Sequence, residues 1–365
     1  MMKTEVAIIG GGIVGMCCAF YLQKAGFDLV VIEKGSIANE ASYNNMCGLW
    51  PNHTSRPDST KEFADSSLAL FEEMAVRERF NFEFRRNGVL EVLPRAADID
   101  KVERDINERK GSGYDVKFLG SEEISAMEPY LSKSFSGGVF CPRDANANSF
   151  LLAREITAYL KKNGITVLEH AEVSSMLVDD GRITEIKSSS GSISPEYVVN
   201  SAGPWSPLIG DFAGVSVPVQ PAKGYMIETG PQRKVLSTAV LNGYIVVTQR
   251  PAGQIRTGGT VEQVGFDREF TSKKKEEIWN SACSVLPAMQ GFSAIEYRTG
   301  FRPLTPDNLP IIGYSGKIRN LVFATGHFRR GFELATGTGK AVSELIQGGI
   351  TSIDIRFASP GRFSL

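Results

Sequence analysis

The sequence predicts an α/β fold: a Rossmann-like domain built from both ends of the chain, with an inserted, mainly antiparallel β-sheet domain. Three observations predict this arrangement. A strand, a glycine-rich turn, a helix and a second strand follow one another in residues 5–34. In residues 320–346 a strand breaks at glycines and continues as a helix. Between these segments, residues 81–94 and 243–260 are patterned as antiparallel hairpins.

The composition is that of a globular protein and excludes several classes. With 365 residues, of which 42% are hydrophobic, the chain can bury the core of one large or two ordinary domains. Its 40 basic and 41 acidic residues nearly cancel, so we expect no nucleic-acid partner. The apolar stretch 6–22 contains four glycines and predicts a strand, a turn and a buried helix. We therefore expect no integral membrane segment.

The cysteines and histidines bear on compartment and metal binding. Five cysteines, with no C-x-x-C pair, indicate a reducing compartment. We expect a cytoplasmic protein, either free or attached to the inner face of a membrane. His53, His170 and His327 lie far apart in the sequence and no cysteines cluster, so we expect no metal site.

The first segment, EVAIIGGGIVGMCCAFYLQKAGFDLVVIEK, carries a dinucleotide-binding pattern. Gly10 permits a tight turn after the first strand, Gly12 lets the backbone approach a pyrophosphate, and Gly15 lets helix and strand pack closely. The N-terminus of the helix then faces the phosphates with unpaired N–H groups. Glu33 ends the second strand, where a carboxylate accepts hydrogen bonds from an adenosine ribose and repels a 2′-phosphate. The pattern therefore predicts FAD or NAD rather than NADP.

Three later segments favour FAD over NAD. Segment 35–53 is polar and rich in small residues, which suits a loop along a diphosphate and a flavin. In segment 196–210 a strand runs into the sharp turn AGPW. The third segment is TGHFRRGFELATGTGKAVSELI, in which Gly326 and Gly331 let the backbone approach a flavin ring. Its helix begins near Glu333 and directs its positive end toward that ring.

With these motifs in this order, the chain resembles the D-amino-acid oxidase superfamily of FAD-dependent oxidoreductases, which includes glycine oxidase, D-amino-acid dehydrogenase and sarcosine oxidase. The resemblance rests on IIGGGIVG with VIEKG, VVNSAGPWS, GFRPLTPDNLPIIG and NLVFATGHFRRGFELATGTG, which span nearly the whole chain. It implies an adenine near the first glycines, where Val173 contacts it through the backbone, and an isoalloxazine near the last motif. Motifs and resemblance together predict FAD contacts at Gly10, Gly12, Ile13, Val14, Gly15, Glu33, Lys34, Ala41, Ser42, Asn45, Cys47, Gly48, Leu49, Val173, Gly203, Trp205, Gly326, His327, Phe328, Arg330, Gly331, Phe332 and Glu333.

If both ends of the chain bind one FAD, the binding domain is discontinuous. We expect an FAD-binding domain of residues 1–80, 145–217 and 295–365, and a substrate-binding domain of residues 81–144 and 218–294. The first hairpin would turn at Asn87-Gly88 and the second at Pro251-Ala252-Gly253. Both would belong to an antiparallel sheet that covers the substrate, as the resemblance also implies.

Two arginines are candidates for binding the substrate. Arg302 and Arg329 fall where glycine-oxidase-like relatives hold the substrate carboxylate, and the planar fork of an arginine matches a carboxylate with two parallel hydrogen bonds. Tyr244 is a third candidate through its hydroxyl. Two alternatives stay open: Arg302 forms a structural ion pair with Asp307, or Arg330 rather than Arg329 faces the pocket.

Three further positions are open in their roles. His53 lies where some relatives carry residues near the flavin or covalently attached to it; a polar pocket residue, a covalent attachment and a surface loop histidine are the alternatives. Relatives of the glycine oxidase kind often have an Asn and an aliphatic residue at the positions of Arg330 and Glu333. The size and charge of the substrate are therefore open.

The resemblance implies oxidation of the C–N bond of a small amino or imino acid of the glycine, sarcosine, proline or D-amino acid type. Hydride transfer from the α-carbon to flavin N5 would give an imine, which water hydrolyses. No Ser/His/Asp or Cys/His pattern predicts a nucleophile. The alternatives are a 2-hydroxy-acid dehydrogenase, which would use the same anchor, and a flavoprotein subunit of a larger complex. The electron acceptor, oxygen or a quinone or dye, and homo-oligomer formation also stay open.

Overall fold

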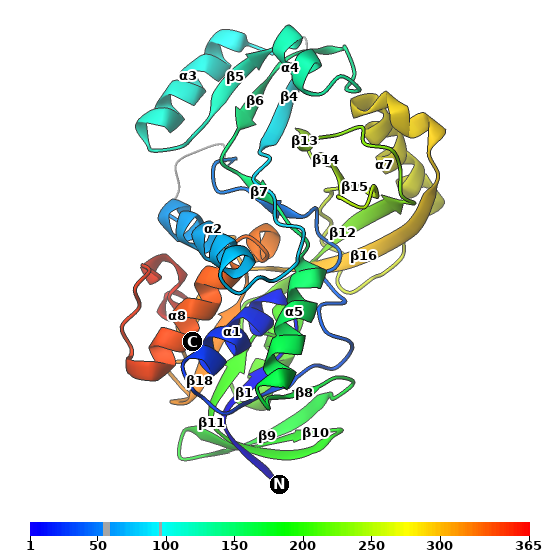
Figure 1. Cartoon of the computed structure of the whole chain (residues 1–365). Coiled ribbons are helices and arrows are strands. Elements are labelled where there is room, and N and C mark those ends of the chain that lie inside the picture. Colours follow the sequence, from blue (N-terminus) through cyan, green and yellow to red (C-terminus); the bar gives the residue numbers. More distant parts are fainter. Residues whose placement is uncertain (54–58, 95–96) are drawn as a thin grey trace.

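The computed structural model describes residues 1–53, 59–94 and 97–365. A largely parallel sheet lies at one end of the molecule, in the lower part of Figure 1, and a mainly antiparallel sheet extends to the other end. The first and last segments of the chain meet in the parallel sheet, as the N-terminal β1 and the C-terminal β18 both lie there. The mixed α/β architecture predicted from the sequence is confirmed.

The parallel sheet has, in spatial order, the strands β17 (Ile311–Tyr314), β18 (Leu321–Thr325), β11 (Gly191–Asn200), β1 (Met2–Ile9), β2 (Leu29–Ile32) and β8 (Thr166–Leu168). All neighbours in this row are parallel except β17 and β18. From β11 the sheet continues as an antiparallel meander, through β10 (Arg182–Ser188) and β9 (Val173–Asp179).

Successive residues of β1 face two different hydrophobic layers. Val6 and Ile8 pack into a core shared with α1 (Ile13–Lys24), α2 (Lys61–Val76), α5 (Ser149–Lys162) and α8 (Ala335–Gly348). Ala7 and Ile9 pack on the opposite face against α6 (Ser206–Phe212), β9 and β10. The second half of the strand, residues 6–9, is apolar without alternation because both faces of the sheet are covered there, which is typical of parallel sheets.

Helices α1 and α8 touch through a glycine. A Cβ atom on Gly339 would lie 2.5 Å from the carbonyl oxygen of Cys17, so only glycine permits this approach. The run of small residues TGTG at the start of α8 therefore brings together the two helices that follow the first and the last nucleotide motif.

The antiparallel sheet has, in spatial order, the strands β16 (Ala294–Leu304), β12 (Gln220–Thr229), β15 (Ile255–Gly258), β14 (Ile245–Gln249), β13 (Ala239–Asn242), β4 (Val89–Pro94), β6 (Phe135–Cys141) and β5 (Lys117–Gly120). Its neighbours are antiparallel apart from β13 and β4. Three helices lie at the same end of the molecule as this sheet (Figure 1): α3 (Ile99–Gly111), α4 (Ser121–Met127) and α7 (Ser272–Val285). A short ribbon, β3 (Gly48–Leu49) with β7 (Ala145–Asn146), lies between the two sheets (Figure 1).

Short 3-10 turns complete the described elements, at Gly203–Trp205 (η1), Pro287–Gly291 (η2), Phe328–Arg330 (η3), Arg356–Ala358 (η4) and Pro360–Phe363 (η5). In the part of the chain that the structure describes, no helix is both long and apolar enough to cross a bilayer.

One of the two predicted hairpins is confirmed and the other is wrong. β14 and β15 pair across the turn at Pro251-Ala252-Gly253. Residues 81–86 do not pair with β4, because the backbone N–H of Arg85 donates to Asn146 in β7 (2.9 Å). Gly88 supplies the left-handed φ of +73° that an Asn-Gly turn requires, yet it bends the chain from one ribbon into another sheet.

Strand β16 also departs from the expected division of the chain. It pairs with β12 along its length and so belongs to the antiparallel sheet, whereas the predicted division assigned residues 295–365 to the FAD-binding domain. The pairing assigns β16 to the antiparallel sheet, since Arg302 opposes Ala222 and Gly300 opposes Gly224 in one continuous register. The other boundaries stay predictions.

Candidate active site

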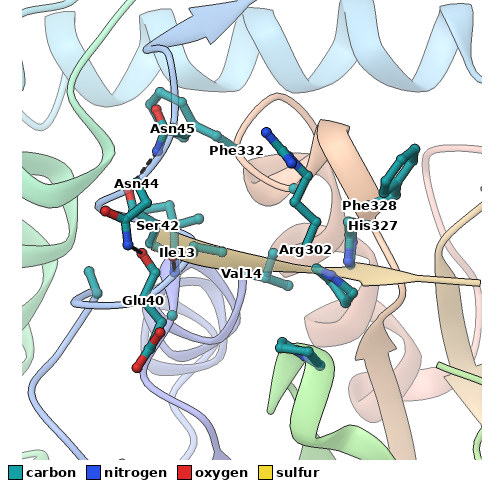
Figure 2. A pocket seen from close by; sticks show the side chains of 18 of the residues that line it. Ile13, Val14, Glu40, Ser42, Asn44, Asn45, Arg302, His327, Phe328 and Phe332 are labelled. Carbon is teal, nitrogen blue, oxygen red and sulfur yellow. Dashed lines mark hydrogen bonds between the residues drawn. The ribbon is translucent and has the colours of Figure 1, made fainter. Parts of the chain in front are cut away.

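A cavity of about 610 Å³ lies between the two sheets and is lined by residues from both. Figure 2 shows Ile13 and Ser42 from the N-terminal part of the chain on its wall, together with Arg302, His327 and Phe328 from the C-terminal part. The predicted site residues in its lining are Gly10, Gly12, Ile13, Val14, Glu33, Lys34, Ala41, Ser42, Asn45, Gly48, His53, Val173, Gly203, Trp205, Tyr244, Arg302, His327, Phe328, Arg329, Arg330, Gly331, Phe332 and Glu333.

The glycines of the first motif have different surroundings. Gly10 has a φ of +109°, and a Cβ atom there would lie 2.5 Å from the carbonyl oxygen of Ser201. A Cβ atom on Gly15 would lie 2.0 Å from the carbonyl oxygen of Gly10. At Gly12 it would meet only Ser42 Oγ, at 3.4 Å, so this position faces open space in the cavity. Gly10 and Gly15 thus serve packing, whereas Gly12 keeps room for a ligand.

Two polar side chains near this turn, those of Glu33 and Ser42, are placed where a dinucleotide could bind. Both carboxylate oxygens of Glu33 accept backbone N–H groups, one from Gly11 and one from Gly35, each at 2.7 Å. These bonds fix the carboxylate at the edge of the cavity and leave further lone pairs for ribose hydroxyls. Ser42 Oγ accepts the N–H of Ile13 (2.8 Å) in the first turn of α1. The loop after β2 is thereby attached to the N-terminal end of α1, and the N-terminal ends of helices are favourable positions for phosphate groups.

The turn between β18 and α8 holds a strained residue and a buried histidine. Phe328 has a φ of +47°, a left-handed conformation that a bulky side chain rarely adopts and that is typical of functional sites. His327 Nε2 lies 2.9 Å from the hydroxyl of Thr338 in α8. Burial lowers the pKa of His327 to about 3, so its imidazole is neutral at physiological pH. The turn thus presents a fixed, uncharged wall to the cavity.

Arg302 is a half-buried cation whose charge is not neutralised by the protein. Its Nη1 donates to the carbonyl oxygen of Thr260 (2.9 Å), and among the described residues no carboxylate lies within 4.0 Å of its guanidinium. Burial, and then the nearby charge of Arg329, lower the pKa of Arg302 to about 10. The alternative of an ion pair with Asp307 is wrong, because Asp307 binds Arg362 instead (2.7 Å).

Arg329 and Arg330 have different partners. Arg329 is exposed, and its guanidinium carbon lies 5.3 Å from the ring centre of Phe328 and 5.8 Å from that of Tyr244. Tyr244 is itself 71% exposed, on the turn between β13 and β14. Arg330 also lines the cavity, but it is held by Glu333 through an ion pair of 2.6 Å. The geometry therefore favours Arg329 as the second arginine available to a ligand.

The comparisons with known proteins identify the family of the chain. The family model described as DAO, FAD dependent oxidoreductase, matches residues 5–345. The chain belongs to this family. It is 25% identical to D-amino acid dehydrogenase of Vibrio vulnificus strain CMCP6, over 94% of this chain and 96% of the relative. Its fold matches L-proline dehydrogenase from P. horikoshii (26% identity, 99% of this chain and 98% of that one, TM-score 0.91). It also matches glycine oxidase from Geobacillus kaustophilus (25% identity, 98% of each chain, TM-score 0.92).

The residues present fit the cofactor of this family. The open space at Gly12, the fixed carboxylate of Glu33 and the N-terminal end of α1 form a cradle of the kind that holds a dinucleotide. The same cavity continues to the turn at Phe328–Arg330, so one elongated molecule can contact both motifs. As a member of this FAD-dependent family, the enzyme uses FAD.

His53 lies in the pocket rather than on the surface of a loop. Its Nε2 is 3.4 Å from an oxygen of Glu91, on β4, and its ring centre is 6.0 Å from that of Trp50. The neighbouring imidazole lowers the pKa of Glu91. Both residues line the cavity, which supports the polar pocket role for His53.

Four predicted cofactor residues are absent from the described lining: Gly15, Cys47, Leu49 and Gly326. Gly15 and Gly326 serve close packing, as a Cβ atom on Gly326 would lie 2.6 Å from the Thr305 side chain. Cys47 and Leu49 are buried in the protein interior. For these four, direct cofactor contact stays a prediction, and their positions show a role in shaping the wall.

Several lining residues were missed by the sequence reasoning. They come from distant strands and from the loop after β2: Ser36, Asn39, Glu40, Asn44, Met46, Trp50, Glu91, Gly224, Leu241, Val246, Gly300 and Pro303. Gly224 and Gly300 oppose each other in the β12 and β16 pairing, and a Cβ atom on Gly224 would lie 2.2 Å from Arg302 Nη1. A glycine within each of two strand segments was the available signal, but it indicates a close approach only once the register is known.

Proposed function

We propose that this enzyme oxidises the C–N bond of a small amino or imino acid, with Arg302 as the anchor of the substrate carboxylate. The observation that carries the proposal is the half-buried guanidinium of Arg302, with no carboxylate partner among the described residues, in the same cavity as the dinucleotide motif. A buried cation without a counter-ion is costly, and a ligand carboxylate removes that cost. The names of the relatives, which act on amino acids, support the same substrate class.

The residues of the chain orient the substrate. Arg302 has N–H groups left beyond the one that binds Thr260, and these suit a two-pronged contact with a carboxylate. Arg329 and Tyr244 close the open side, while neutral His327 and Phe328 form the wall beside them. When bound, FAD would supply a two-electron acceptor, at N5, for the hydride of the α-carbon, and the imine left behind would be hydrolysed by water.

Anaerobic titration of the FAD-loaded protein tests this function. The panel is glycine, sarcosine, L- and D-proline, several D-amino acids and the matching 2-hydroxy acids. The visible absorbance band of the oxidised flavin is followed during the titration. We expect an amine to bleach the flavin and a 2-oxo acid to form. Bleaching by hydroxy acids alone would replace the proposal with a 2-hydroxy-acid dehydrogenase. An oxidised flavin with every compound would favour a subunit that needs its complex.

The acceptor and the location belong to the same proposal. Readmitting air to the reduced enzyme separates an oxidase, which reoxidises at once, from a dehydrogenase that requires a quinone or dye. A cytoplasmic location, free or at the inner face of a membrane, is supported by the cysteines, all of which are buried and unpaired. Gel filtration of the active protein, alone and in lysate, tests whether it works as a monomer, a homo-oligomer or a complex subunit.

A further inference from the structure

The charged side chains near the turn at Phe328–Arg330 are paired unevenly. Glu91 lies 3.4 Å from His53 Nε2, and Glu333 forms an ion pair with Arg330. Arg302 and Arg329, in contrast, have no carboxylate within 4.0 Å among the residues that the structure describes. This end of the cavity therefore holds two arginine charges that are not paired with a carboxylate of the described residues.

The two arginines stand at different depths. Arg302 is half-buried on β16, over the backbone of Gly224, with Nη1 fixed by the carbonyl oxygen of Thr260. Arg329 is exposed, and its guanidinium lies between the rings of Phe328 and Tyr244. The left-handed backbone of Phe328 fixes the direction in which the chain enters Arg329. One guanidinium in the cavity lining is thus partly shielded from solvent, whereas the other is exposed.

A single carboxylate compensates one of these charges. The two guanidinium groups already repel each other, as the effect of Arg329 on Arg302 shows. A substrate with one carboxylate would leave the second charge without an anion, whereas a substrate with two would satisfy both arginines, each by charge-assisted hydrogen bonds.

We propose, on the basis of the function above, that the substrate is a dicarboxylic amino or imino acid. Arg302 holds the carboxylate next to the oxidised carbon, and Arg329, beside Tyr244, holds the second carboxylate at the mouth of the cavity. The oxidised bond and the electron acceptor are those of the proposed function; only the second binding contact is new.

The first test measures binding without turnover. Succinate and butyrate have the same chain length and differ in one carboxylate, and neither carries a C–N bond. Calorimetry on the FAD-loaded enzyme should give an affinity for succinate at least about tenfold higher than for butyrate. In Arg329→Gln this ratio should fall to about one to threefold. Arg356→Gln, a change of an exposed arginine that binds Asp354 far from the cavity lining, is the control and should keep the wild-type ratio.

The second test measures flavin reduction with matched substrates. D-aspartate is compared with D-2-aminobutyrate, and iminodiacetate with sarcosine, under anaerobic conditions. Higher kcat/KM for each diacid, lost in Arg329→Gln, supports the inference. Equal values for each pair, or an equal loss for both members in the variant, overturn it and assign Arg329 to the same carboxylate as Arg302. In that case reduction by monocarboxylic amines still supports the proposed function. A flavin reduced by no amine overturns the proposed function, while the succinate measurement decides independently whether Arg329 binds a second carboxylate.

Discussion

Replacing Arg302 by lysine tests the substrate anchor, because the change keeps the positive charge and removes the fork. An arginine binds a carboxylate with two parallel charge-assisted hydrogen bonds, whereas a lysine acts as a point charge. The loss of one such bond costs about 1.5–3 kcal/mol, which corresponds to about a 10- to 150-fold lower kcat/KM. Within the protein the change removes only the hydrogen bond to the carbonyl oxygen of Thr260, so the fold should tolerate it.

The assay combines steady-state kinetics on the best amine with two checks on the protein. FAD content from the absorbance spectrum and the melting temperature should both match those of the wild type. Arg319→Lys is the matched control, since Arg319 is an exposed arginine paired with Asp180. A value of kcat/KM within about twofold of the wild type, in a variant that retains FAD, would remove Arg302 from the site and refute the reasoning.

Three further predictions concern the cofactor cradle and the buried titratable groups. Gly15→Ala places a Cβ atom 2.0 Å from the carbonyl oxygen of Gly10 and should lower the melting temperature with or without FAD. In Gly12→Ala the new Cβ atom meets only a hydroxyl at 3.4 Å, so the melting temperature of the FAD-free protein should not change. This second variant should instead bind FAD more weakly in a fluorescence titration. Glu33→Gln should raise the Kd for FAD about tenfold, since ribose hydroxyls lose a charged acceptor; an unchanged Kd would exclude that contact. Burial lowers the pKa of His327 to about 3, so the unfolded chain binds the extra proton and stability falls as the pH drops below 6.5. Burial raises the pKa of Asp144 to about 7, so this group makes the folded state more stable as the pH drops from 7 toward 4. In Asp144→Asn only the effect of the histidine remains, so the free energy of unfolding measured in urea should fall by about 2 kcal/mol between pH 6.5 and 5. In His327→Gln only the effect of Asp144 remains, so the free energy of unfolding should rise as the pH drops over the same range. Parallel pH profiles of the two variants would contradict these pKa shifts.

Much of the cofactor cradle could be predicted because its determinants are local. The strand, the glycines at fixed spacing and the terminal Glu33 lie within one short segment, and the steric reason for Gly15, the carbonyl oxygen of Gly10, lies within that segment too. The steric reason for Gly10 is the distant Ser201, which the segment alone does not reveal. The second hairpin was predictable for the same reason, since Pro251 to Gly253 define its turn.

The remainder of the site depends on register between distant strands. Glu91 on β4 lies beside His53 in the segment after β3, and Gly224 lies under Arg302 only through the pairing of β12 with β16. No local pattern specifies such pairings. The ion pair between Arg330 and Glu333 spans three residues, but its direction depends on the turn at Phe328, whose positive φ is unusual for an aromatic residue.

A crystal structure of the FAD-loaded enzyme with succinate tests the central claim most directly, because it places the cofactor and a carboxylate in one cavity. We predict FAD between the Gly12 cradle and the turn at Phe328–Arg330, with one succinate carboxylate on the guanidinium of Arg302 and the other on Arg329. FAD in the cavity with no carboxylate on Arg302 would contradict the proposed substrate anchor. FAD outside this cavity would contradict the account of the site as a whole.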